Sequence, residues 1–535
     1  MKLYSTFAAG ILLPCFAHLI AAAPAQKSAA LVACVKRALI GENVESRIVT
    51  PSNDTYTAAS SGDVLFAEYP AVIAYATSID EISPLVQCGT STGFKVTPRS
   101  GGHHFENWSA LNGTLVVDTS HINYVKPSED YSTVTVAAGA KLGQIYETMD
   151  PTGHTVNGGI CPTVALGGYL GVGGYSMQMR LHGMAVDHVQ SIKAVLADGS
   201  LVTASATENP DLFWAMRGGG MYGFAVEATI NTIEIPRSAM VWMNFTAPTR
   251  PEATQKYLDW AAKQDPYFTS QLNLYGDHAQ ISGWYIGKTA QELTTIVKAS
   301  GLLDVPDVFY RISANCSTQN SRNFWENTQI ECTDDATAHE VFNTQYNVVP
   351  DDFSAVPGAP AQFGFDDVPV LPNETKATPW PRVAIINKTL FVTKSKPLTS
   401  ETIQYIVEKS GALPAELGFW TEMTSWNIST PATSAFAWQA EAEYLFRFEV
   451  TRSSNATLEA IGQNFMDDLE AYLVPRIGTA SYAGYMDAHI NSNPYEAYWG
   501  DNVCRLSSVK KQYDPTNFFS NPFSIPPTTP KGVSC

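Results

Sequence analysis

The feature that most constrains this 535-residue chain is a glycine-dense run between residues 158 and 174. Its seven glycines stand at positions 158, 159, 167, 168, 171, 173 and 174, and Cys161 lies near its start. Glycines allow close approach of the backbone to a phosphate, whose oxygens successive N–H groups can bind. The standard phosphate motifs fail, because no Gly-Lys-Ser/Thr follows and Ser176 replaces the last glycine of a fingerprint starting at Gly171. A tight structural turn and a pyrophosphate-binding turn both remain compatible with the run.

The N-terminal segment has the layout of a secretory signal peptide. A single early charge, Lys2, precedes an apolar stretch over residues 10–20 and small residues at 21–25. We expect residues 1–25 to be removed, together with Cys15. No later apolar run is long enough to span a bilayer, so we expect a soluble secreted protein.

Seven of the eight cysteines would then remain, and an odd number in an oxidising compartment leaves at least one outside the intramolecular disulfides. Sequence proximity favours three disulfide pairs and leaves Cys161 outside them. A different cysteine outside the pairs, or different pairings, would also be compatible with seven cysteines. The favoured pairs are Cys34 with Cys88, Cys316 with Cys332, and Cys504 with Cys535.

Nine Asn-x-Ser/Thr sequons support secretion, because together behind a signal peptide they are typical of a glycosylated extracellular protein. The candidate acceptors are Asn53, Asn107, Asn112, Asn244, Asn315, Asn373, Asn387, Asn427 and Asn455.

Net charge and chain length limit the partners and the domain organisation that we expect. Lysine and arginine total 33 against 51 aspartates and glutamates, giving a net charge of -18, which argues against nucleic acids and anionic membranes as partners. The length of the mature chain predicts two or more domains. We expect a monomer.

Short β-branched strands alternate with helices and glycine turns from Val64 to Ile235, as in an α+β or α/β nucleotide-binding domain. From about residue 240 to 478 the pattern changes to longer helices between strands and predicts a second domain that closes over the first. The predicted strands are 70–76, 94–98, 114–118, 132–137, 383–386 and 444–450, and the predicted helices are 78–93, 141–150, 251–264, 290–300, 400–409 and 456–473.

A second glycine turn leaves the strand at 94–98, with the sequence Arg99-Ser100-Gly101-Gly102-His103-His104. A histidine after glycines is usually a surface loop residue. Here, however, a second nucleophile, Cys161, stands on the other glycine loop of the same predicted domain. An imidazole and a thiolate together suggest a covalently held cofactor.

Four motifs of the chain occur in the same order as in one protein family. They are Gly101-Gly102-His103, the run from Gly159 to Val164, the run from Asn209 to Gly220, and one C-terminal piece made of 498–502 together with 512–519. On these motifs the chain resembles the berberine-bridge-enzyme-like oxidases of the vanillyl-alcohol-oxidase (PCMH-type) superfamily, which include secreted fungal oligosaccharide oxidases.

The resemblance implies an α+β fold with a two-part FAD-binding domain and a substrate domain whose antiparallel sheet is covered by helices. The implied divisions are an FAD-binding domain over 26–240 with its core at about 68–237, a substrate domain over 241–479, and a segment over 480–535 that returns to the first domain. The family also pairs the positions of Cys34 and Cys88.

By the same resemblance, His103 would bond the flavin 8α-methyl group and Cys161 the flavin C6. Other positions implied to contact the cofactor are Arg99, Ser100, Gly101, Gly102, Val164, Gly167, Gly168, Tyr169, Gly171 and Asn502. A small side chain at the position of Val164 admits dioxygen in the family.

Tyr498 matches a tyrosine implied to act as general base on a substrate hydroxyl. A phenol with an ordinary pKa near 10 needs neighbours that lower this pKa. Glu422 is the candidate for an assisting carboxylate, with a solvated strand position as the equally open alternative.

Three positions depart from the family pattern. Phe105 stands where the oligosaccharide oxidases carry a substrate-touching tyrosine, Tyr169 replaces a histidine, and His104 replaces a small serine. The predicted function is oxidation of a hydroxyl group in an oligosaccharide or another alcohol, by hydride transfer to FAD and reoxidation by O2 to give H2O2. The alternatives are a secondary-metabolite or aromatic alcohol as substrate, a dehydrogenase with another acceptor, and a flavin-binding protein without turnover.

Overall fold

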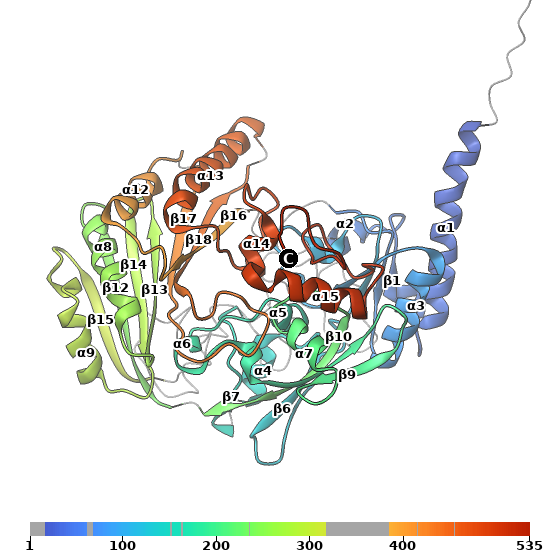
Figure 1. Cartoon of the computed structure of the whole chain (residues 1–535), viewed down its shortest axis with the longest axis horizontal. Helices are drawn as coiled ribbons and strands as arrows, with labels where there is room; N and C mark the ends of the chain where they lie inside the picture. Colours follow the sequence, from blue (N-terminus) through green and yellow to red (C-terminus); the bar gives the residue numbers. More distant parts are fainter. Residues whose placement is uncertain are drawn as a thin grey trace, which may run out of the picture.

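The computed structural model describes residues 16–60, 68–149, 152–161, 164–234, 236–316, 385–414, 416–453 and 455–535. These residues form two lobes that lie side by side, and the C-terminal helices lie where the lobes meet (Figure 1). We call them the N-terminal lobe, which contains two larger sheets, and the sheet lobe, which contains one. No helix in these ranges has both the length and the apolar character that crossing a bilayer requires.

The first sheet of the N-terminal lobe has the strand order β1-β2-β4-β3. Strands β2, β4 and β3 are parallel, and β1 is antiparallel to β2. Nearly every strand residue is buried, as expected for parallel strands covered by helices. The bounds are β1 Ile48–Val49, β2 Val72–Tyr75, β3 Val96–Arg99 and β4 Leu115–Asp118, and the covering helices are α1 Phe16–Ala38 and α3 Ile82–Thr92.

The second sheet is fully antiparallel, with the order β5-β6-β10-β8-β9. Its central strand β10 alternates buried and half-buried residues, so one face packs on the core of the lobe. The bounds are β5 Val125–Pro127, β6 Thr133–Ala137, β8 Val189–Val195, β9 Leu201–Ser205 and β10 Phe224–Asn231. Helix α2 Tyr56–Ser60 packs on the first sheet, and the other short elements of the lobe are α4 Leu142–Met149, β7 His154–Thr155, α5 Leu166–Gly171, α6 Met179–His182, α7 Pro210–Met216 and β11 Ile233–Glu234.

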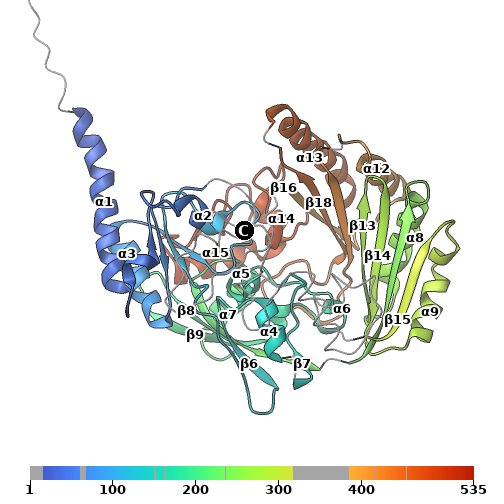
Figure 2. The ribbon, with the colours of Figure 1, turned by 180° about the vertical axis from the view of Figure 1, so that it is seen from behind.

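The sheet lobe contains a seven-stranded antiparallel sheet with the order β15-β12-β14-β13-β17-β18-β16. Four helices cover its outer face, as both ribbon views show (Figures 1 and 2). The strands are β12 Ser238–Thr246, β13 Phe268–Tyr275, β14 His278–Tyr285, β15 Phe309–Cys316, β16 Ile385–Thr393, β17 Phe419–Ser425 and β18 Ala442–Thr451, and the helices are α8 Arg250–Trp260, α9 Ala290–Ala299, α12 Ser400–Ser410 and α13 Ala456–Ile477.

The two faces of this sheet differ in polarity. One cross-strand row consists of Leu272, Met423 and Phe446, which belong to the apolar core of the lobe. The neighbouring row, one residue along each strand, consists of Asn273, Glu422 and Arg447 and therefore points to the opposite face. The sheet thus presents a polar face away from its covering core.

The C-terminal segment leaves α13 and returns to the N-terminal lobe through η8 Ala483–Tyr485, α14 Pro494–Trp499 and α15 Val503–Tyr513. The buried Lys510 ammonium donates to the carbonyl oxygens of Met221 at 2.7 Å and Phe519 at 2.6 Å. Trp499 Nε1 donates to the Gly218 carbonyl oxygen at 3.2 Å. These contacts fasten the chain end to the N-terminal lobe.

Two of the three expected disulfides are confirmed. Cys34 in α1 is bonded to Cys88 in α3, and Cys504 is bonded to Cys535. The third pair cannot be described, because Cys332 lies outside the described residues, although Cys316 is disulfide-bonded. Cys161 carries a thiol.

The expected α+β architecture is confirmed, with two sheets in the first lobe and a helix-covered antiparallel sheet in the second. The helices predicted from periodicity agree with α3, α4, α8, α9, α12 and α13 to within a few residues, apart from the end of α13. Among the longer strands, β8, β9, β10, β12, β13, β14, β15 and β17 were not predicted. In β13 the adjacent polar residues Ser270 and Gln271 are both buried, which obscures the alternation typical of a strand.

Two of the predicted glycosylation acceptors are buried, which argues against their use. Asn107 is 0% exposed and its Nδ2 donates to the Ser60 carbonyl oxygen, while Asn387 is 4% exposed and its Nδ2 donates to the Tyr485 carbonyl oxygen. A glycan on either nitrogen would disrupt the fold. Of the remaining acceptors, those at 53, 112 and 455 are exposed, those at 244 and 427 are half-buried, Asn373 lies outside the described residues, and the side chain of Asn315 is not described.

We predict that glycopeptide mapping of the chain produced with a secretion signal in a glycosylating fungal host will find glycans at Asn53, Asn112 and Asn455 and unmodified asparagine at Asn107 and Asn387. The exposed acceptors leave room for a transferred sugar, whereas the buried amides are used in hydrogen bonds. Substantial occupancy at Asn387 in folded material would contradict this expectation.

Candidate functional site

The carboxyl ends of the parallel strands β3 and β4 form one wall of the site. Arg99 and Asp118 stand opposite each other at these ends, and Arg99 Nε donates to Asp118 Oδ2 at 2.5 Å. Arg99 also donates to the Ala59 carbonyl oxygen and to the Tyr75 hydroxyl. Both partners of the ion pair are buried. Three partners thus hold the Arg99 side chain at the end of β3, directly before the turn.

The turn after β3 brings Gly102, with φ of 72°, to the half-buried His103. His104 turns back into the protein, where its ring packs 4.9 Å from the Trp108 ring and its Nδ1 accepts a hydrogen bond from the Glu106 amide. Burial lowers the pKa of His104 to about 4. Both histidines are half-buried, but the His104 ring is held by Trp108 and by the Glu106 amide and stays neutral.

Helix α5 lies close to this turn because its residues are small. A Cβ at Gly167 would come within 2.6 Å of Ser100 Oγ, whereas a Cβ at Gly168 would meet no atom within 4 Å. A Cβ at Gly171 would come no closer than 3.7 Å, to the Gly220 carbonyl oxygen. The turn at Ser100 and the bare backbone of α5 thus form a cradle that side chains at these positions would fill.

The cradle suits a dinucleotide. Ligands of open α/β sheets bind beyond the carboxyl ends of parallel strands, and exposed glycine backbone allows a pyrophosphate to approach. Two half-buried nucleophiles, His103 and Cys161, belong to the same lobe. No group of three or more His, Cys, Asp or Glu side chains in the described ranges is arranged to hold a metal ion.

Cys161 lies on the segment that leads into α5. Its carbonyl oxygen accepts from the Val164 amide at 3.3 Å, and the Tyr146 hydroxyl donates to the neighbouring Gly159 carbonyl oxygen at 2.5 Å. Both Cys161 and Val164 are partly buried against the core of the N-terminal lobe. The thiol is close enough to Tyr485 to affect the pKa of its hydroxyl. This proximity connects the N-terminal lobe to the C-terminal segment.

The glycine run ends by placing Tyr175 against the sheet lobe. Gly173 and Gly174 have φ of 99° and 66°, and a Cβ on Gly174 would come within 2.7 Å of the Tyr169 ring. Tyr169 donates its hydroxyl hydrogen to the Tyr175 carbonyl oxygen at 2.8 Å. Tyr169, expected near the cofactor, therefore supports the conformation of the Tyr175 segment.

Glu422 is one of the points at which the two lobes meet. This carboxylate in β17 is 1% exposed. It accepts hydrogen bonds from Arg447 at 2.8 Å, from Thr424 at 3.2 Å and, across the lobe boundary, from the Tyr175 hydroxyl at 3.1 Å. Burial disfavours the charge of the Arg447 guanidinium. The carboxylates of Glu422 and Glu449 nevertheless raise the pKa of Arg447 well above its ordinary value. Glu422 is thus a buried, fully paired group and not a solvated strand residue.

Tyr485 completes this cluster and was missed by the sequence analysis. The Arg447 guanidinium lies 4.9 Å from the centre of its ring, the Phe105 ring meets it edge-on at 5.1 Å, and the Tyr175 ring lies at 6.2 Å. Burial raises the pKa of Tyr485, and Arg447 opposes that increase. Nothing in the sequence distinguishes Tyr485 among 24 tyrosines, because its neighbours come from distant segments.

Tyr498 lies elsewhere. It is 1% exposed, and its hydroxyl accepts a hydrogen bond from the Asp487 amide at 2.9 Å. The expectation that neighbours lower its pKa is wrong, because burial raises it and the carboxylates of Asp487 and Glu106 raise it further. Asn502 also lies in a supporting contact, in which its Nδ2 donates to the Ala435 carbonyl oxygen at 3.1 Å.

Two family models match the chain. A model described as FAD binding domain matches residues 70–205, and one described as Berberine and berberine like matches residues 481–526. The first match covers the cradle, His103 and Cys161, and the second covers Tyr485.

Similar proteins are fungal flavin enzymes. The FAD-linked oxidoreductase pynB of Aspergillus niger is 46% identical over 96% of each chain, and pytB of Aspergillus terreus is 44% identical over 93% of this chain and 62% of its own length. The chitooligosaccharide oxidase of Gibberella zeae is 26% identical over 86% of this chain and 87% of its own.

Solved structures share the fold. A glucooligosaccharide oxidase from Acremonium strictum, whose structure is described as carrying a 6-S-cysteinyl, 8α-N1-histidyl FAD, superposes with a TM-score of 0.74 at 22% identity. The superposition covers 94% of this chain and all of the solved chain.

We predict that His104→Asn will reduce the loss of stability on acidification. The unfolded chain takes up a proton on His104 near pH 6.5, whereas the folded chain does so only near pH 4. The free energy of unfolding therefore falls as pH decreases through this window. Between pH 7 and pH 5 the free energy of unfolding of the variant should fall by about 1 kcal/mol less than that of the unsubstituted protein. This figure allows for partial exposure of the His104 ring. Chemical denaturation at both pH values measures this, and equal losses would contradict the prediction.

Proposed function

Because this chain belongs to the FAD-linked oxidoreductases with a berberine-like C-terminal segment, we propose that it oxidises a hydroxyl group of an oligosaccharide or another alcohol. The contact that carries this proposal is the cluster of Tyr485, Arg447 and Glu422 beside Cys161. It combines a phenol, a fixed cation and a carboxylate near one of the two candidate flavin attachment residues.

We propose that FAD is attached through both His103 and Cys161. The support is their half-buried position on the two segments that border the cradle, together with the cysteinyl and histidyl links named for the glucooligosaccharide oxidase. Two bonds from different segments would prevent cofactor loss after secretion. The signal-like N-terminus and three exposed sequons support an extracellular location.

In this proposal Tyr485 is the base. Acting as the phenolate, its oxygen takes the proton of the substrate hydroxyl as the neighbouring C–H bond breaks, and the neutral phenol is formed. The Arg447 guanidinium, 4.9 Å from the centre of the Tyr485 ring, stabilises the negative charge of the phenolate before that transfer. Glu422 holds Arg447 through a 2.8 Å hydrogen bond and also anchors Tyr175, so the cation stays in place.

When bound, FAD would supply a hydride acceptor and a route for the two electrons to dioxygen, with hydrogen peroxide as the product. The rings of Phe105, Tyr175 and Tyr482 enclose the Tyr485 ring at centroid distances of 5.1 to 6.2 Å. Such an apolar surrounding limits water at the phenol and strengthens the effect of Arg447. The small side chain of Val164, three residues after Cys161, favours dioxygen as the acceptor over a dehydrogenase reaction.

A second candidate is oxidation of an aromatic alcohol in secondary metabolism. Phe105 lacks the hydroxyl that a tyrosine would present to a sugar, and its ring instead packs edge-on against Tyr485. In addition, the relatives at 44–46% identity carry no sugar in their names, whereas the oligosaccharide oxidase is 26% identical. Both candidates use the same base and cofactor and differ only in the substrate.

We predict that flavin absorbance will stay with the precipitated polypeptide after acid denaturation. His103→Ala and Cys161→Ala should each retain flavin through the other bond, whereas the double variant should release it. Mass spectrometry of proteolytic fragments locates the adducts. Unmodified peptides for both residues in fully loaded protein would refute the double attachment.

We predict that Tyr485→Phe will lower kcat by about 10²- to 10⁴-fold, because removal of a general base has effects of this size. Peroxide release is measured across oligosaccharides and phenolic alcohols, and the preferred class identifies the substrate. Turnover with an artificial acceptor but without peroxide would instead favour a dehydrogenase.

Two substitutions make this test specific. Tyr285→Phe removes a phenol on β14 that donates to Asp265 at 2.7 Å, and it should leave kcat unchanged. Tyr498→Phe should lower kcat much less than Tyr485→Phe does. A larger loss of kcat in Tyr498→Phe would assign the base to Tyr498.

A further inference from the structure

Residues 480–491, which we call the Tyr485 loop, carry the phenol of the proposed function. Strand β16 holds this loop by successive contacts. The Phe391 amide donates to the Ala480 carbonyl oxygen at 2.7 Å, Ser481 Oγ donates to the Thr389 carbonyl oxygen at 2.8 Å, and Asn387 Nδ2 donates to the Tyr485 carbonyl oxygen at 3.0 Å. The loop therefore follows the course of β16.

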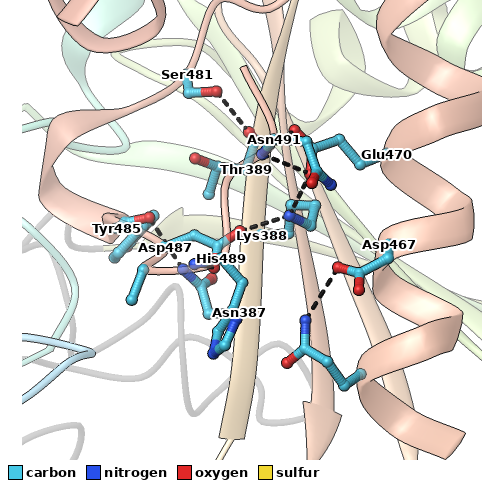
Figure 3. Close-up of polar contacts among 12 residues, drawn as sticks. Asn387, Lys388, Thr389, Asp467, Glu470, Ser481, Tyr485, Asp487, His489 and Asn491 are labelled. Atoms are coloured by element: carbon cyan, nitrogen blue, oxygen red, sulfur yellow. Dashed lines mark hydrogen bonds and ion pairs between the residues drawn. The ribbon is translucent and has the colours of Figure 1, made fainter. Parts of the chain in front are cut away.

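A buried ion cluster lies directly beyond Tyr485. Lys388 in β16 donates to Asp487 in the loop at 2.5 Å and to Glu470 in α13 at 2.6 Å. All three side chains are at most 5% exposed. Figure 3 shows Lys388 between the two carboxylates, with Asp487 on the side of Tyr485. Although burial alone would lower the pKa of Lys388, Asp487 and Glu470 raise it above its ordinary value, so the ammonium stays charged.

The backbone beyond the ion cluster is also bound on its other side. The Asp487 amide donates to the Tyr498 hydroxyl at 2.9 Å, and the Ala488 amide donates to Glu106 Oε1 at 3.0 Å. Glu106 follows Phe105, whose ring meets Tyr485 at 5.1 Å. The position of Asp487 is thus linked to the loop that carries His103.

We propose that Lys388 is a positioning residue, which acts through Asp487 to fix the loop backbone and so holds the Tyr485 ring against Arg447. This inference rests on the proposed function, because it assigns the anchor of the proposed base. Lys388 does not contact the reacting atoms; its ammonium restrains a residue two positions from the phenol. A buried charge that loses its partner is costly, so the loop cannot move away from β16 without that cost.

The test substitution is Asp487→Asn. It removes the carboxylate on the loop side, while the Lys388–Glu470 pair remains balanced and the Asn oxygen can still accept from the His489 amide, as Asp487 Oδ1 does at 2.8 Å. The side-chain amide nitrogen of the introduced Asn cannot accept a hydrogen bond from the Lys388 ammonium. We expect kcat to fall by about 10- to 100-fold, as for a displacement of about 1 Å, with KM within about 2-fold.

Hydrogen exchange of the peptide over residues 480–491 provides a readout independent of turnover. The Asp487→Asn variant should exchange faster in this peptide, with flavin absorbance retained. Asp467→Asn is the matched control, since Asp467 on α13 accepts from Gln463 of the same helix at 3.0 Å (Figure 3). The control should change neither exchange nor kcat. Slow exchange in Asp487→Asn, equal to that of the unsubstituted protein, would overturn the proposal even if no alcohol proves to be a substrate.

A double-substitution cycle tests whether Lys388 acts through Asp487. In the Asp487→Asn background, Lys388→Gln should lower kcat by less than about 2-fold further, because the connection is already broken. Independent effects of the two substitutions on kcat would overturn the proposal. Faster exchange in Asp487→Asn with an unchanged kcat would retain the anchor but refute Tyr485 as the base, which separates this inference from the proposed function.

Discussion

The buried carboxylate of Glu422 is the interaction on which the rest of the site depends. It accepts hydrogen bonds from Arg447 in its own sheet and from Tyr175 in the other lobe, and so it joins the lobes and fixes a cation at the junction. A carboxylate at 1% exposure is stable only when its charge and lone pairs are satisfied. The same bonds that satisfy it align Arg447 with Tyr485, so the structural requirement and the proposed chemistry coincide.

Glycine makes this junction possible from the side of the N-terminal lobe. Gly167 allows α5 to approach Ser100, and Gly174 allows Tyr175 to reach the sheet lobe past the Tyr169 ring. Side chains at these positions would separate the segments that carry His103, Cys161 and Tyr175. The glycine-dense run therefore serves both as a cradle for a dinucleotide and as a turn that brings two lobes together.

Much of the fold could be predicted from the sequence, and less of the site. Helices with regular apolar periodicity agree with the structure, because their pattern depends only on one buried face. The strands β13 and β17 could not be predicted, since buried polar residues such as Gln271 and Glu422 obscure the alternation that indicates a strand. Tyr498 and Tyr485 show the same limit within the site: a short motif cannot tell which phenol is enclosed by supporting amides and which meets Arg447.

The sequence by itself indicated the mixed α+β architecture and the two glycine loops with a histidine and a cysteine, because each depends on local residue types and spacing. It favoured, without excluding other pairings, the two disulfides that the structure confirms. Only the tertiary structure decided that Asn107 and Asn387 are buried, that Glu422 pairs with Arg447 and Tyr175, and that Tyr485 joins them. These outcomes depend on contacts between residues tens to hundreds of positions apart. Burial and electrostatic pairing depend on which residues are close in space. A local stretch of sequence does not show which distant residues those are.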